Sequence, residues 1–143
     1  MTETRVVKSK KIIMGKLSYG CDLLEELTKV CSDNEIKLGK ISAIGAVQKS
    51  CIGYYNQIKR EYRFINSEKH SEILNLTGNV SIKDDKPFVH AHVTLADEAG
   101  NAHGGHLASG TTVFACEFII QPFDGSDFIR GIDEKTGLPL WEI

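Results

Sequence analysis

Residues 88–96 alternate between apolar and polar side chains, and this pattern restricts the local fold more strongly than any other in the chain. Alternation with a period of two is typical of a β-strand that buries one face. The apolar positions are Val89, Ala91, Val93 and Leu95. A turn-forming sequence, 97–101 (DEAGN), follows with a glycine where a three-residue hairpin loop needs a left-handed residue. The segment is therefore predicted to form an antiparallel hairpin with residues 98–100 as its loop.

Histidines occupy the polar face of this predicted hairpin. His90 and His92 share that face of the first strand. If Asp97 pairs with Asn101, the ladder places His106 opposite His92, with Cβ atoms about 4.5–5.5 Å apart. Three neutral imidazoles at that spacing can share one ion and leave a coordination position open. We therefore expect His90, His92 and His106 to bind one divalent metal, with zinc as the expected ion.

Two alternatives stay open for these histidines. They could be a row of polar side chains on the solvated face of a hairpin, and a bulge at Gly104 and Gly105 would move His106 out of line. The other two histidines are expected outside the site. His103 has the opposite parity and should face away, whereas His70 lies in a polar run and should be a surface residue.

Length and composition indicate one soluble domain. The 143 residues are enough for a single core, and we expect one domain over residues 1–143 with its core at about 5–123 and a tail at 124–143. No apolar run approaches the roughly 20 residues of a membrane helix, so no membrane association is expected. The N-terminal residues lack the apolar core of a signal peptide. The four cysteines are widely spaced with no Cys-x-x-Cys pair, which favours free thiols in a reducing cytoplasm.

The remaining patterns predict an α+β fold. Residues 22–30 have the apolar stripe of a helix. Strands are predicted at 5–16, 40–47, 51–56, 61–65, 72–82 and 111–121, and the tail should hold turns and one short strand ending at Trp141. The sum is a two-layer domain in which one main helix packs on a mixed, largely antiparallel sheet.

Glu117 lies inside the most apolar predicted strand. A carboxylate in a sheet interior needs a partner or a raised pKa. Glu117 is thus a candidate fourth ligand, an acceptor for an imidazole N–H, or a catalytic general base. An equally weighted alternative is a glutamate at a subunit interface or sheet edge. Glu72, Asn75 and Asn79 are weaker candidates for a polar pocket wall.

Five motifs in sequence order make the chain similar to a known family. The motifs are 44–47 (IGAV), 52–55 (IGYY), 72–79 (EILNLTGN), 87–93 (PFVHAHV) and 104–107 (GGHL). Together they resemble the plants-and-prokaryotes-conserved (PPC) domain, whose prokaryotic members are named for DNA binding. The resemblance implies a homotrimer, a metal site at His90, His92 and His106, and a DNA or protein partner.

Two functions follow as hypotheses. The first is a cytoplasmic, zinc-binding homotrimer that acts as a DNA-associated or regulatory scaffold module. The second is a zinc-dependent enzyme in which water bound at the three histidines attacks a small-molecule substrate, with Glu117 as base. Plant relatives carry an Arg-Gly-Arg-Pro AT-hook that this sequence lacks, and the net charge of −2 does not favour phosphate binding. The glycine-rich turns match neither a Walker loop nor a dinucleotide fingerprint, and His-Ala-His is not the His-Glu-x-x-His of zincins.

Overall fold

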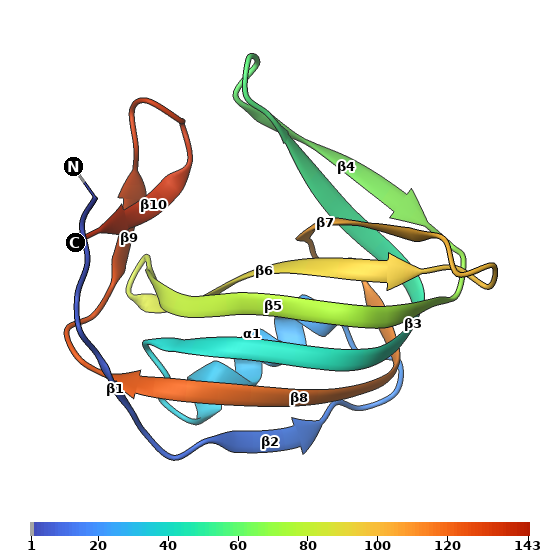
Figure 1. Ribbon diagram of the computed structural model, residues 1–143, viewed down its shortest axis with the longest axis horizontal. Coiled ribbons are helices and arrows are strands. Elements are labelled where there is room, and N and C mark those ends of the chain that lie inside the picture. The colour runs from blue at the N-terminus through green and yellow to red at the C-terminus, as the bar shows by residue number, and fades with distance from the viewer. Residues whose placement is uncertain (1) are drawn as a thin grey trace.

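β-Strands make up most of the protein, as Figure 1 shows for the computed structural model, which describes residues 2–143. The strands are β1 (Lys8–Ser9), β2 (Ile13–Lys16), β3 (Gly39–Asn56), β4 (Glu61–Ser67), β5 (Ser71–Lys83), β6 (Lys86–Ala96), β7 (Ala102–Leu107), β8 (Thr112–Asp124), β9 (Ile129–Ile132) and β10 (Pro139–Glu142). One mixed sheet holds the strands of the described residues, with β5 and β9 parallel and the other pairs antiparallel. With one helix, α1 (Leu23–Asp33), this agrees with the predicted α+β class.

Strand β3 is the centre of the sheet. Its first half pairs with β8 and β5, and its second half pairs with β4 and β7. Because β7 also pairs with β6, and β6 with β5, strands β3, β5, β6 and β7 form a closed circuit of hydrogen-bonded neighbours. This circuit places β4 close to the hairpin that carries the histidines (Figure 1).

Strand β3 is continuous between the strands predicted at 40–47 and 51–56, because Lys49 pairs with Thr112 on β8 and Ser50 pairs with Ser67 on β4. A glycine bends the first half of this strand. Gly45 has a φ of 147°, and the register with β5 shifts between Ala43 and Gly45. A Cβ atom on Gly45 would collide with the backbone of Ala115 on β8. The glycine therefore lets the strand bend through a bulge without ending it.

Helix α1 supplies one side of the core. Asp22 caps its N-terminus, because the Oδ1 atom of Asp22 accepts hydrogen bonds from the backbone N–H groups of residues 24 and 25, both at 3.0 Å. The fully buried Leu23, Leu27 and Cys31 lie four residues apart and pack with strand residues in the core. The helix continues one turn beyond the predicted end at residue 30. No helix within residues 2–143 is long and apolar enough to cross a membrane.

The hairpin of β6 and β7 has the predicted loop. The N–H of Asp97 donates to the carbonyl of Asn101 at 3.1 Å, and the N–H of Gly100 donates back to the carbonyl of Asp97 at 2.9 Å. Gly100 is in the left-handed region with a φ of 78°. These contacts confirm that residues 98–100 form the loop.

Both ends of the chain differ from the prediction. The predicted strand at 5–16 is split into β1 and β2, which pair separately with β8. The tail contains two strands instead of one, because β9 and β10 form a hairpin and β9 joins β5 at the parallel pair Ile82 and Ile129. The four cysteines are free, as predicted, and three of them are buried.

Candidate metal centre and its surroundings

Three histidines come together on the face of the β6–β7 hairpin that points away from the core. His92 and His106 are direct register partners, and His90 lies two residues along β6. The ring centroids are 5.2 Å apart for His90 and His92, 5.1 Å for His90 and His106, and 5.8 Å for His92 and His106. One ring nitrogen of each lies within 4.8 Å of the others. The predicted convergence of the three rings is therefore confirmed.

The donor set fits a metal ion. Zinc–imidazole bonds are about 2.0–2.1 Å long, so nitrogens on one tetrahedral ion lie roughly 3.3 Å apart. Small ring rotations bring donors within 4.8 Å of one another to that spacing. The Nδ1 atom of His106 is buried without a hydrogen-bond partner, which is costly unless a bound ion or ligand satisfies it. The structure thus brings together three imidazoles suited to one divalent ion, while their role as ligands stays a prediction.

Burial keeps two of the imidazoles neutral. It lowers the pKa of His90 to about 4, and His106, Arg130 and His92 add smaller effects in the same direction. Burial also lowers the pKa of His106, with His92 and Arg130 as further causes. A neutral imidazole keeps a free lone pair at physiological pH, which a metal requires.

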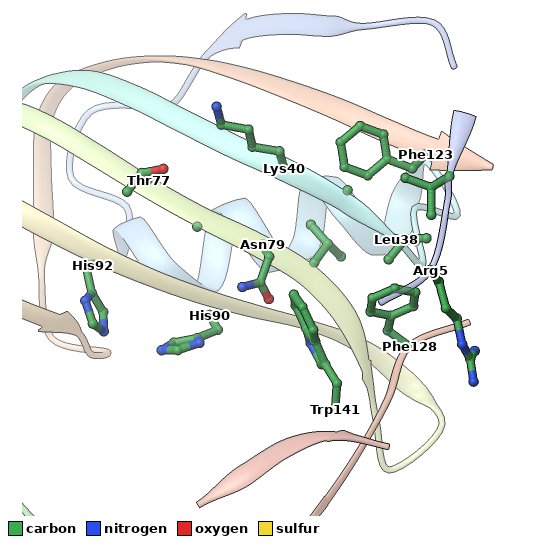
Figure 2. Close-up of a pocket in the computed structure, with 14 residues that line it drawn as sticks. Arg5, Leu38, Lys40, Thr77, Asn79, His90, His92, Phe123, Phe128 and Trp141 are labelled. Carbon is green, nitrogen blue, oxygen red and sulfur yellow. The ribbon is translucent and has the colours of Figure 1, made fainter. Parts of the chain in front are cut away.

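The histidines lie between two cavities. His90 and His92 line a cavity of about 530 Å³, and Figure 2 shows these two rings at one end of it, with Phe128 and Arg5 toward the other. Asn79 and Trp141 lie between these ends (Figure 2). His90 and His106 also line a second cavity of about 370 Å³. His90 therefore separates two spaces that a small molecule could enter.

Arg130 on β9 is a neighbour of the histidines that sequence reasoning missed. Its guanidinium donates from Nε to Oγ of Ser81 at 2.7 Å, from Nη2 to Oδ1 of Asn79 at 2.7 Å, and from Nη1 to the carbonyl of Pro139 at 2.8 Å. Asn79 is the register partner of His90. Arg130 lies in a tail segment without a strong strand pattern, so no sequence signal could have placed it beside β6.

Tyr62 on β4 is a second neighbour that sequence reasoning missed. Its ring centroid lies 4.8 Å from that of His106. Burial raises the pKa of Tyr62, Tyr55 adds to the rise, and Arg130 opposes it. This contact depends on strand β3, because β3 pairs with β4, which holds Tyr62, and with β7, which holds His106.

Glu117 does not join the histidines. Strands β3 and β5 lie between β8, which carries Glu117, and β6. Glu117 is exposed and lines a separate cavity with Ile44 and Asn75, so the expectation of a carboxylate inside the sheet is wrong. The reason is that β8 buries only the alternate face, which carries Cys116 and Phe118. His103 and His70 are exposed and lie outside the cluster, as predicted.

Solved structures share this fold over the whole chain. A metal-containing protein from Archaeoglobus fulgidus is 42% identical, with a TM-score of 0.95 and coverage of 99% of this chain and 100% of its own. A plant- and prokaryote-conserved protein from Pyrococcus horikoshii is 35% identical, with a TM-score of 0.93 and coverage of 99% and 98%.

A curated relative and a family model complete the comparison. The bifunctional protein GlmU of a Synechococcus strain is 30% identical over 131 residues, which are 90% of this chain but 20% of GlmU. The chain thus spans about a fifth of the length of this relative. The model of the Plants and Prokaryotes Conserved (PCC) domain matches residues 4–124. The chain therefore belongs to the Plants and Prokaryotes Conserved domain family.

Proposed function

We propose that the protein is a zinc-binding module in which His90, His92 and His106 hold the ion. The observation that carries this proposal is the convergence of three imidazole nitrogens within 4.8 Å. Within residues 2–143 no other His, Cys, Asp or Glu joins the group, so a four-coordinate ion has one position left for a small ligand. The metal-containing relative from Archaeoglobus fulgidus supports the proposal. Zinc is preferred to nickel, copper and iron because it accepts a tetrahedral imidazole set.

Elemental analysis of the purified protein tests this proposal. We expect one zinc per chain in the wild type and none in His92→Ala. His103→Ala is the matched control, because His103 lies on β7 of the same hairpin but outside the cluster. Stoichiometric zinc in His92→Ala would refute the assignment.

The proposed module is a homotrimer. Support comes from large apolar side chains exposed on the sheet around β3 and β8, which a monomer would leave in water. They are Met14, Ile44, Phe114 and Ile119, with Ile44 and Phe114 each 57% exposed. Glu117 lines the same surface, which favours the interface interpretation of this glutamate. In a ring of three subunits each interface is heterologous, so this surface would pack against a different surface of the next subunit.

A zinc-dependent enzyme is the second candidate, and the two cavities beside His90 favour it. When bound, the metal would supply Lewis acidity at a position open to substrate. Cobalt substitution tests for that open position with azide as the probe. A change in the cobalt visible spectrum supports an exchangeable site, and an unchanged spectrum at saturating azide contradicts it.

A DNA partner is the remaining part of the proposal. Two structural neighbours carry names that refer to DNA binding. The exposed segment 8–11 carries three lysines that could contact phosphates. Segment 8–11 is short and the net charge of the chain is negative. DNA association is therefore a weaker proposal than zinc binding.

A further inference from the structure

Arg130 carries a half-buried positive charge that faces neutral acceptors. Its three hydrogen bonds go to a hydroxyl, an amide oxygen and a backbone carbonyl. The guanidinium carbon also lies 5.2 Å from the ring centre of Phe88 and 5.8 Å from that of Trp141. These contacts satisfy N–H groups but do not neutralise the charge. A desolvated cation without an anion is costly, so its retention here points to a ligand.

The second cavity adjoins this guanidinium. It lies between β4, β6 and the β9–β10 hairpin, and Arg60, Lys83 and Arg130 all line it. Glu61, which is exposed at the start of β4, is the carboxylate in the lining. The ion pair found within residues 2–143 is Lys29–Asp33 on α1, so the cations of the cavity form no salt bridge. The lining therefore carries three positive charges against one negative charge.

Hydrogen bonds between distant segments fix two of the residues that line this cavity. The hydroxyl of Tyr55 donates to the carbonyl of Thr136 at 2.7 Å. Arg60 donates to the carbonyls of Glu134 and Lys135 at 3.1 and 3.0 Å. These bonds join the tip of the β3–β4 arm to the loop between β9 and β10, and both Tyr55 and Arg60 also line the cavity. The positions of these lining residues are thus set by hydrogen bonds between two separate parts of the chain.

We propose that this cavity binds a small organic carboxylate and that Arg130 receives the carboxylate group beside the histidines. A guanidinium has five N–H donors, so one N–H on Nη1 and one on Nη2 remain after the three bonds within the protein, and a carboxylate can accept from them. Apolar and aromatic side chains form the walls and suit an organic body; they are Tyr55, Tyr62, Phe88, Leu138 and Leu140.

A carboxylate fits this cavity better than a phosphate group. A guanidinium also binds phosphate, but inorganic phosphate has no apolar part to contact the walls formed by Tyr62, Phe88 and Leu140. The inference deepens the proposed function by naming the class of ligand that would bind beside the metal. It rests on the proposed zinc site only where the ligand would contact the metal.

Benzoate is the probe, with neutral benzamide of nearly the same shape as its control. Titrations followed by NMR would use the full chain with and without zinc. We expect benzoate at up to about 10 mM to shift the Nε–H signal of Arg130 and the ring signals of Tyr62, while benzamide does not. Inorganic phosphate forms the third arm.

The variants test the assigned residue. Arg130→Gln should weaken benzoate binding at least about tenfold, and Arg130→Lys, which keeps the charge but loses the fork, should weaken it less. Arg63→Gln is the control, because Arg63 is exposed on β4 and does not line the cavity. Thermal unfolding confirms that each variant is folded, and the wild-type signal shifts locate the ligand even if both Arg130 variants unfold.

The outcomes separate this inference from the zinc proposal. Zinc binding without any benzoate effect would overturn the carboxylate site and leave the zinc proposal standing. If benzoate binding depends on Arg130 in a protein that takes up no zinc, the carboxylate site stands and the zinc proposal is overturned. Equal binding of benzamide, or tighter binding of phosphate than of benzoate, would also overturn the carboxylate assignment.

Discussion

Asn79 on β5 and His90 on β6 are register partners, so the amide that accepts a hydrogen bond from Arg130 lies beside a histidine of the cluster. This relationship joins the β9–β10 hairpin to the sheet at the place where the three rings converge. A change at either end of it should therefore be felt at the site.

Zinc should stabilise the folded protein. The ion is expected to bind the three converged imidazoles and not the unfolded chain, and a ligand at 100 times its Kd adds about 2.7 kcal/mol to the free energy of unfolding. Thermal unfolding of metal-free protein with added zinc should show a raised Tm. His106→Ala should abolish the rise and His103→Ala should keep it. A rise of the same size in both variants would contradict the site.

Acid should destabilise the metal-free protein. The imidazole of His90 stays neutral in the folded state down to a pKa of about 4, whereas in the unfolded chain it takes up a proton near pH 6.5. Between these values the unfolded chain binds more protons, so the free energy of unfolding falls as the pH is lowered from 6.5 to about 4. The lowered pKa of His106 adds to the same trend.

Urea unfolding with a chelator measures this pH dependence. His90→Asn should lose less stability over the interval than the wild type. His70→Asn is the control, because His70 is exposed, and it should follow the wild-type curve. If His90→Asn and the wild type lose stability equally, the burial of His90 does not contribute.

Gly104 should be required for the pairing of β6 and β7. A Cβ atom there would collide with the carbonyl oxygen of Val93 and lie 3.1 Å from the Cα of Thr94. Gly104→Ala should push the strands apart and lower both the Tm and the zinc content. Gly100→Asn is the control, since nothing lies within 4 Å and asparagine tolerates the positive φ. Full zinc loading and an unchanged Tm in Gly104→Ala would show that the strands can adjust.

A charge at Ile44 should break the proposed trimer. Ile44 is 57% exposed in the apolar surface around β3 and β8, and a buried glutamate in its place would lack a partner. Light scattering should give three times 15.8 kDa for the wild type and a lower mass for Ile44→Glu. Ile58→Glu, at a position 95% exposed beyond the end of β3, should remain trimeric. A monomeric wild type would refute the assembly.

DNA binding by this module should be weak and sensitive to salt. Phosphate contacts release counterions, so the affinity of a chain with a net charge of −2 should be measurable only at low ionic strength and fall steeply as salt rises. Fluorescence anisotropy with labelled duplex DNA at about 20 and 200 mM salt measures this dependence. Replacing Lys8, Lys10 and Lys11 with glutamine should remove the binding. A flat titration at low salt would eliminate the DNA partner.

The sequence by itself determined the local features of this protein. Alternation over residues 88–96 and the turn at 97–101 defined the hairpin, and the parity of its side chains placed His92 opposite His106. Asp22 and the apolar stripe behind it defined the start of α1. These features depend on residues that are close together in the sequence, so local sequence patterns are enough to predict them.

Tertiary structure alone decided what surrounds the histidines. Arg130 lies near them because β9 pairs with β5 and Arg130 bonds to Asn79, about 50 residues away in sequence, and such a contact leaves no local signal. Tyr62 reaches His106 through the closed circuit of strands. Alternation along β8 puts Glu117 on the opposite face from Cys116 and Phe118. Which of these two faces is buried depends on where α1 packs. A periodic pattern tells which side chains share a face, but only the packed sheet determines which face meets water and which charges meet each other.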